Sequence, residues 1–166
     1  MSDSNTFGTE LVTPESALFA GAATAVMLRS SEGDFTVLEG HTAVVGDVVP
    51  SIVRIEQPDA TIAAFCVHGG FVQVATDPGA AVGLVEDASP EERSTRVTVL
   101  AGVAEAVGEI DVARAQAAKE AATALLASLS SRDDEEGAFE REVAERALAR
   151  AELRLEASEL AGPARG

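Results

Sequence analysis

The chain lacks most of the residues from which disulfides, thiolate metal sites and stacking surfaces are built. Among 166 residues there are one cysteine, two histidines and six phenylalanines, with no tryptophan or tyrosine. A single cysteine excludes a disulfide within the chain and a zinc site with several thiolates. So few aromatic rings leave little surface for stacking bases. The sequence therefore predicts neither a disulfide-stabilised domain nor a stacking-based nucleic-acid binder.

Positive charge and long apolar runs are also scarce. The sequence has twelve Lys and Arg residues and 28 Asp and Glu residues, which gives a net charge of −16. Nucleic acids and anionic lipid surfaces both require a basic face, so neither is expected as a partner. The most apolar run, residues 17–28, contains Gly21 and Thr24 and is too short for a membrane span, so direct lipid insertion is not expected. Residues 1–9 are polar without a basic residue, which predicts no secretory signal.

Turn-forming residues concentrate in the first two thirds of the chain. Five of six prolines and ten of fourteen glycines precede residue 103. Between them lie short apolar or alternating runs, typical of an antiparallel sandwich or barrel. Strands are expected near residues 9–13, 24–29, 35–38, 52–56, 61–67, 71–75, 83–86 and 95–100.

The apolar period changes to that of a helix after Ile110. Asp111 is placed to cap the first helix, and a second helix is expected over about residues 138–159 after the polar segment 130–137. The apolar positions are Ala115, Ala118, Ala122, Leu125, Leu126 and Leu129, then Ala144, Ala147, Leu148, Ala151 and Leu155. Small side chains on both stripes favour an antiparallel hairpin.

These patterns predict an α+β chain with an N-terminal antiparallel β-sandwich and a C-terminal helical hairpin. We expect a disordered tail over residues 1–8, the sandwich over 9–107, the hairpin over 108–160 and a second tail over 161–166.

Two groups of side chains offer chemistry, each with a structural alternative. Cys66 and His68 alternate on one expected strand and share a face, which permits either a catalytic dyad or a core cysteine beside a turn histidine. No third ligand stands at metal-like spacing, so no metal site is predicted. Arg146, Arg150 and Arg154 form a ladder with a spacing of four, which suits either an anion or solvated arginines offset by neighbouring glutamates.

Five strings occur in an order that indicates a known family. They are Leu11-Val12-Thr13-Pro14-Glu15, Glu32-Gly33-Asp34-Phe35-Thr36-Val37-Leu38-Glu39-Gly40-His41, Val67-His68-Gly69-Gly70-Phe71-Val72-Gln73-Val74, Arg96-Val97-Thr98-Val99-Leu100-Ala101 and Ile110-Asp111-Val112-Ala113-Arg114-Ala115. Over about residues 9–157 the chain resembles the epsilon subunit of bacterial F-type ATP synthase, the counterpart of the mitochondrial delta subunit.

The resemblance implies a sandwich of about ten strands and two C-terminal helices in the central stalk of a rotary motor. Members of the family are not catalytic. The sandwich binds the gamma subunit and rests on the c-ring, which couples proton-driven rotation to ATP synthesis. The hairpin folds down or extends into the alpha/beta head, where it inhibits ATP hydrolysis. The resemblance also implies a peripheral location on the cytoplasmic face of the bacterial plasma membrane.

Carried over by position, the resemblance implies two sets of site residues. Contact with the c-ring is expected from Glu32, Asp34 and His41. No cofactor is predicted other than a regulatory ATP, which some bacterial members of the family bind. The candidate residues for ATP are Glu105, Ile110, Asp111, Arg114, Ala115, Arg150 and Arg154. The structural alternative is that Asp111 caps the helix and Arg114 pairs with a nearby acid.

Three departures from the family pattern bear on these expectations. Ala121 stands where such members place a further arginine, and Glu39 stands where a proline is usual. Residues 77–94 are longer than the usual turn, and residues 80–85 are expected to form an added hairpin arm.

An alternative function is a free-standing ATP-sensing regulatory module without a synthase partner.

Overall fold

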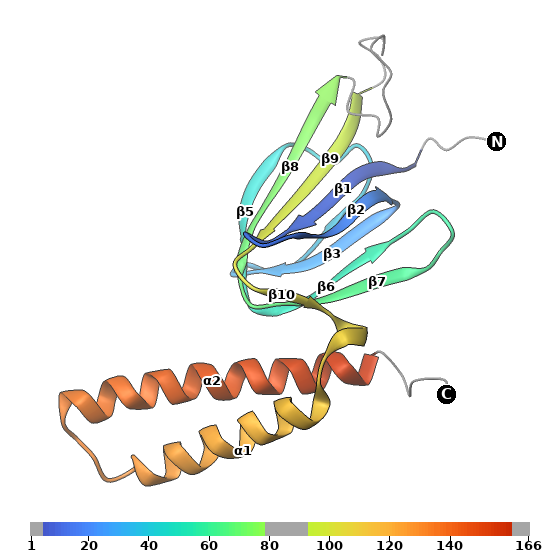
Figure 1. Cartoon of the computed structure of the whole chain (residues 1–166). Helices are drawn as coiled ribbons and strands as arrows, with labels where there is room; N and C mark the ends of the chain where they lie inside the picture. Colours follow the sequence, from blue (N-terminus) through green and yellow to red (C-terminus); the bar gives the residue numbers. More distant parts are fainter. Residues whose placement is uncertain (1–4, 79–92, 161–166) are drawn as a thin grey trace. The chain divides into compact units, whose positions relative to one another are not determined.

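The computed structural model describes residues 5–78 and 93–160 of the chain. The chain divides into two compact units between Ala106 and Val107. The first unit is built from strands and the second from helices (Figure 1). The α+β fold class is therefore confirmed.

The first unit contains ten strands among its described residues. They are β1 (Phe7–Val12), β2 (Ala17–Ala23), β3 (Ala25–Ser30), β4 (Gly33–Val37), β5 (Val44–Val48), β6 (Ser51–Glu56), β7 (Ile62–Val67), β8 (Gly70–Pro78), β9 (Arg93–Ala101) and β10 (Ala104–Ala106). They form two five-stranded sheets with the orders β2-β1-β9-β8-β5 and β10-β7-β6-β3-β4 (Figure 1).

The core lies between these two sheets and is made by every second residue of their strands. The alternation of side chains across a strand places apolar residues on the inner faces. In the first sheet the fully or almost fully buried residues include Phe7, Leu11, Val72, Val74, Val97 and Val99. In the second they include Val26, Val37, Val53, Ile55, Phe65 and Val67. Each such side chain contributes about 1.5–3 kcal/mol by leaving water.

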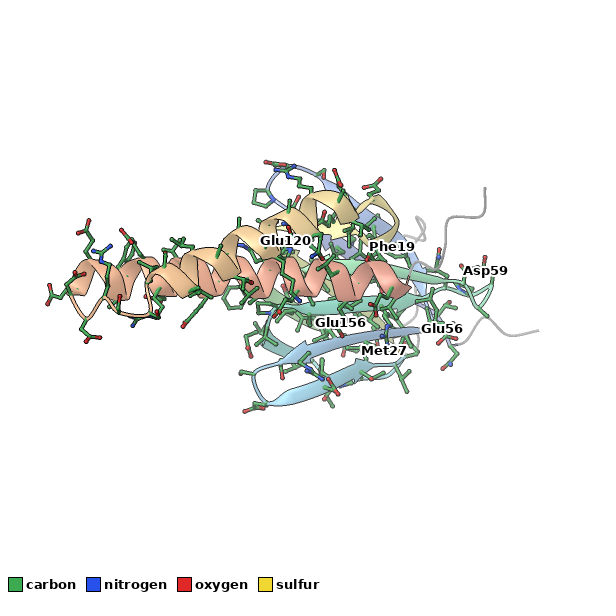
Figure 2. All side chains as sticks on the ribbon, turned by 90° about the horizontal axis from the view of Figure 1, so that it is seen from below. Phe19, Met27, Glu56, Asp59, Glu120 and Glu156 are labelled. Atoms are coloured by element: carbon green, nitrogen blue, oxygen red, sulfur yellow. The ribbon has the colours of Figure 1, made fainter. Side chains whose placement is uncertain are left out.

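Turn chemistry sets the register of the hairpins. Between β6 and β7, Asp59 lies at the tip of the turn (Figure 2), and its Oδ1 accepts hydrogen bonds from the Thr61 amide at 3.0 Å and the Thr61 hydroxyl at 2.6 Å. These hydrogen bonds lower the pKa of the Asp59 carboxyl below its ordinary value of 3.8.

Three strands are missing from the expectations drawn from local pattern. β2 is rich in alanine, β5 contains Gly46 and Asp47, and β10 has only three residues, so none carries a strong alternating signal. Phe7 and Gly8, expected in a disordered tail, belong to β1. The strand expected at 83–86 and the arm expected at 80–85 lie outside the described residues.

The second unit consists of a short turn, η1 (Val107–Glu109), and two helices, α1 (Val112–Ser128) and α2 (Glu135–Leu160). Asp111 caps α1 as predicted, because its side chain accepts a hydrogen bond from the Arg114 amide at 2.9 Å. The second helix begins three residues earlier than expected. Asp134 accepts a hydrogen bond from the Gly137 amide at 2.6 Å and so caps the helix at Glu135. Neither helix is long and apolar enough to cross a membrane.

The two helices bury a seam of small residues. The buried residues are Ala115 and Ala122 on α1, its C-cap residue Leu129, and Ala144 and Ala151 on α2. Neighbouring members on each side are seven residues apart, and each is at most 5% exposed. The apolar stripe predicted from the sequence is wider than the seam that the two helices bury. Ala118 is exposed and Leu125 is 43% exposed, since a close approach of two alanine faces covers only a narrow strip of each helix.

Arginines hold the connection between α1 and α2. The guanidinium of Arg141 donates to the carbonyls of Leu129 at 3.1 Å and Arg132 at 2.8 Å. Arg132 itself contacts carboxylates of Asp134, Glu136 and Glu140. Backbone carbonyls that a helix end leaves unpaired are thereby satisfied.

Gly70 offers a test of the sheet packing. A Cβ on Gly70 would overlap the Leu100 carbonyl oxygen and lie 3.0 Å from the Cα of Ala101 in the paired strand β9. We expect Gly70→Ala to destabilise the sandwich by more than about 2 kcal/mol. The measurement is urea unfolding followed by circular dichroism. Gly102→Ala is the control, because a Cβ there meets nothing within 4 Å, and equal losses for both variants would contradict the packing described.

Candidate docking and anion-binding sites

The β3–β4 hairpin presents two of the expected docking residues at one end of the second sheet. Ser30 pairs with Gly33, so Ser31 and Glu32 form a two-residue turn, and Gly33 has a φ of 129°. Glu32 is exposed at this turn. Within residues 5–78 and 93–160 its carboxylate forms no ion pair, so it remains available to a basic partner.

Asp34 is engaged within the chain. It lies opposite Arg29 in the ladder, and the Arg29 Nε donates to Asp34 Oδ1 at 2.8 Å. The hydrogen bond and charge of Arg29 lower the pKa of the Asp34 carboxyl below 3.8. Both side chains remain exposed, at 59% and 79%, so the pair is screened by solvent. A partner that takes Asp34 must therefore compete with Arg29.

The hairpin turn is tied to the opposite sheet. The amide and hydroxyl of Ser31 each donate to the Asp47 carboxylate of β5 at 3.0 Å. The Val49 amide also donates to the Arg29 carbonyl at 3.0 Å. The Glu32 turn is therefore held in position by both sheets before any partner binds.

His41 lies in the loop after β4. Its Nδ1 is 2.7 Å from the Thr42 carbonyl, and its ring meets Phe35 edge-on with centroids 5.1 Å apart. Phe35 and Asp34 are neighbours on β4 and so point to opposite faces. The structure therefore does not bring Asp34 and His41 to the same face of this strand.

Glu39, which occupies a position where the family usually has proline, anchors that loop. Its Oε1 accepts a hydrogen bond from the Thr95 amide at 3.2 Å, and the Thr95 hydroxyl accepts one from the Gly40 amide at 2.9 Å. These bonds join the loop to β9. The rigidity that a proline would supply covalently comes here from a side chain.

The expected anion-binding residues of the helical unit gather at the start of α1. Ile110 and Ala115 are buried, whereas Arg114 is exposed. The Asp111 carboxylate accepts from the Arg114 backbone amide, which leaves the guanidinium available. Ile110 and Ala115 thus position this turn, and Arg114 is the group that can meet an anion.

Helix register places the arginines of α2 relative to Arg114. Lys119 Nζ and Glu152 Oε1 are 3.2 Å apart, so these residues stand at one level of the antiparallel pair. At about 1.5 Å per residue, Arg154 lies about 4.5 Å along the axis from Arg114, and Arg150 lies about 10 Å from it. By the same count Ala121 stands opposite Arg150, so alanine occupies the level at which the family pattern has a further arginine.

Carboxylates interleave with the arginines of α2. Arg146 is paired with Glu142, as the spacing predicts. Acidic side chains also lie on both helices, including Glu120 on α1 and Glu156 on α2 (Figure 2). In the part of the chain that the structure describes, Arg114 and Arg150 form no ion pair.

The remaining candidate residue, Glu105, does not belong to the helical unit. It belongs to β10 in the first unit, directly opposite Cys66 of β7. Its Oε1 is 3.8 Å from His68 Nε2. Within its own unit Glu105 therefore joins Cys66 and His68.

Cys66 and His68 share a face as predicted, with Sγ and Nε2 3.7 Å apart. Glu105 is the third residue beside them, and all three ligand atoms lie within 4.8 Å of one another. The expectation that no third metal ligand stands nearby came from sequence spacing alone. Only the pairing of β10 with β7 brings Glu105 there, and a three-residue strand is too short to recognise from pattern.

Comparison with protein families gives two matches in order. Residues 6–79 match the model of the "ATP synthase, Delta/Epsilon chain, beta-sandwich domain". Residues 109–159 match the model of the "ATP synthase, Delta/Epsilon chain, long alpha-helix domain". The boundaries of these matches follow the two structural units, with β9 and β10 beyond the first match.

Several curated relatives of the chain are named ATP synthase epsilon chains. The ATP synthase epsilon chain of Desulforudis audaxviator is 37% identical over 118 residues, which cover 71% of this chain and 72% of the relative. The epsilon chain of Thermobifida fusca is 36% identical over 116 residues, covering 68% and 72%. A solved structure of the Euglena gracilis mitochondrial ATP synthase contains a chain with TM-score 0.67 and 23% identity, covering 96% of this chain and 86% of that one. At that identity the solved structure supports the fold alone.

The Arg29–Asp34 pair predicts a measurable titration. Replacing Arg29 by Gln removes the cause of the lowered pKa, so the Asp34 pKa should rise toward 3.8. Because the folded-state pKa is depressed, the pair adds stability above pH 3.8 and loses it as the pH falls through the folded value. The measurement is a carboxyl-carbon NMR titration. Arg96→Gln, which breaks the pair with Glu10 instead, should leave Asp34 unchanged.

Proposed function

The chain belongs to the family of ATP synthase epsilon chains, and we propose that it is a non-catalytic central-stalk subunit of a proton-translocating F-type ATP synthase. The observation that carries the proposal is the pair of consecutive family matches on a sandwich and a helical hairpin. In this role the chain couples rotation of the c-ring to ATP synthesis. The family assignment supports a peripheral place at the cytoplasmic face of a bacterial plasma membrane.

The outer face of the first sheet offers a surface for the gamma subunit. Phe71 on β8 pairs with Leu100 on β9, and they are 60% and 47% exposed. Val45 on β5 is 71% exposed and lies opposite Gln73 of β8. Large apolar side chains grouped on one exposed face are typical of a protein interface. We assign this face to gamma.

The β3–β4 turn suits the c-ring. Glu32 is exposed at its tip, and the Ser31–Asp47 hydrogen bonds fix the turn. An acidic group on a rigid turn can meet basic loops without losing much hydration. Because Asp34 is paired with Arg29, Glu32 is the primary contact, and Asp34 and His41 are secondary ones.

The helical unit supplies regulation by inhibiting ATP hydrolysis when it extends toward the alpha/beta head. Its seam consists mostly of alanine, which buries little apolar area, so separation of the two helices costs less than in a leucine-packed hairpin. Arg114 and Arg154 lie close enough along the axis to share the phosphates of a regulatory ATP, with Arg150 farther away. Binding there would favour the folded hairpin.

The inhibitory role predicts a gain of hydrolysis on truncation. A synthase assembled with a chain lacking residues 111–166 should retain ATP synthesis and show higher ATPase activity, because the inhibitory arm is absent. Activities are measured in membrane vesicles, with a chain lacking only residues 161–166 as the control. Unchanged hydrolysis in the longer deletion would refute inhibition. Failure of the full chain to bind gamma would refute the stalk role.

The ATP site predicts a graded response to arginine substitutions. Arg114→Ala and Arg154→Ala should each weaken ATP binding about tenfold or more, since a hydrogen bond to a charged group contributes about 1.5–3 kcal/mol. Isothermal titration of the isolated chain with ATP and magnesium measures this. Arg146→Ala is the control, because Glu142 already pairs with Arg146. Tight ATP binding without affinity for gamma would favour the free-standing sensor, and no binding by the native chain would exclude both ATP roles.

A further inference from the structure

Three potential metal ligands converge at the edge of the second sheet. Cys66 and His68 lie two residues apart, so their side chains share a face, and Glu105 pairs directly with Cys66 across the β7–β10 ladder. The Cys66 Sγ, His68 Nε2 and a Glu105 carboxylate oxygen lie within 4.8 Å of one another. The amide of His68 also donates to the Val103 carbonyl at 3.0 Å, which fixes the backbone beside the cluster.

Two of the three spacings between these atoms are close to those around a small tetrahedral cation. With the usual zinc bond lengths of about 2.0–2.3 Å, a nitrogen or sulfur ligand and its neighbours in a tetrahedral site are about 3.3–3.6 Å apart. The separations here are 3.7 Å from His68 Nε2 to Cys66 Sγ and 3.8 Å from His68 Nε2 to Glu105 Oε1. We propose that Cys66, His68 and Glu105 form a zinc-binding site with one remaining position for water.

Charge and ligand type favour Zn²⁺ over other common cations. A thiolate and a carboxylate together neutralise a divalent ion, so the occupied site carries no net charge. A sulfur and an imidazole ligand discriminate against Mg²⁺ and Ca²⁺, which prefer oxygen. The Cys66 side chain is buried, and that of Glu105 is 27% exposed, which leaves an approach for the ion from the Glu105 side.

A metal at this position would fasten the last strand of the sandwich. β10 has three residues and is an edge strand that, among the described strands, pairs only with β7. Val107, the next residue along the chain, begins the second unit. The zinc site would therefore stabilise the point at which the chain leaves the sandwich. It employs Glu105 as a ligand, whereas the family resemblance assigned this residue to ATP.

Metal binding can be tested directly on the full-length, tag-free chain. The reduced, chelator-treated protein is titrated with Co²⁺, and zinc affinity is then measured by competition with a chromophoric chelator. We expect one ion per chain and a thiolate-to-cobalt charge-transfer band that Zn²⁺ abolishes. Cys66→Ala should eliminate the band. His68→Ala and Glu105→Gln should each weaken zinc binding at least about tenfold.

The chain provides its own control, since its other histidine is His41. His41→Ala should leave the band and the zinc affinity unchanged. Circular dichroism checks that each variant is folded, and Glu105→Gln on the edge strand changes no core residue. A native chain without the band, or zinc binding that Cys66→Ala and Glu105→Gln leave unaltered, would overturn the site and show only adventitious binding by surface carboxylates.

The stabilisation of β10 by zinc can be measured separately by hydrogen exchange. Zinc should slow hydrogen exchange at the amides of Ala104, Glu105 and Ala106 in the native chain and in His41→Ala. It should have no such effect in Cys66→Ala. Zinc bound at the three ligands without slower exchange in β10 would overturn the fastening. Neither result depends on gamma or ATP, so the outcome is independent of the proposed stalk function.

Discussion

Parallel pairing between β1 and β9 brings residues 8–12 beside residues 96–100 and joins the two ends of the sandwich sequence. β1 lies between β2 and β9, so the whole first sheet depends on this ladder. Leu11, Val97 and Val99 are fully buried, and all three lose their inner-face neighbours if the ladder breaks. With no disulfide and no tryptophan or tyrosine, the core consists mainly of small branched side chains whose packing requires the correct register.

Local pattern was sufficient for the parts of the fold in which the signal is strong. Alternating apolar residues with glycine or proline at their ends predicted seven of the described strands, and Asp111 marked the start of α1. It failed for β2, β5 and β10, whose strand conformation depends on neighbours distant in sequence. The early start of α2 was missed because several acidic residues precede it, and the hydrogen bond from Gly137 selects Asp134 as the cap.

The candidate sites show the same limit at the level of single side chains. Asp34 belongs to β4 rather than to the turn, and its pairing with Arg29 depends on a cross-strand register that the sequence does not display. Spacing along α2 predicted the pair of Glu142 with Arg146, since both residues belong to one helix. The family resemblance assigned Glu105 a role from its position in the sequence. Only the fold shows that Cys66 and His68 lie beside it.

The bonds from Arg141 to two carbonyls of the α1–α2 connection determine how the hairpin can deform. These bonds fasten that end. Toward Val112 and Leu160 the helices are joined by alanine contacts and the Lys119–Glu152 ion pair, so we expect the end distant from the connection to separate first. The 17 residues of α1 make a lever. At 1.5 Å per residue its length is about 25 Å, and a rotation of about 10° at the connection displaces the far end by about 4 Å. A small rotation at the α1–α2 connection would therefore move the first residues of α1 by nearly the pitch of a helix.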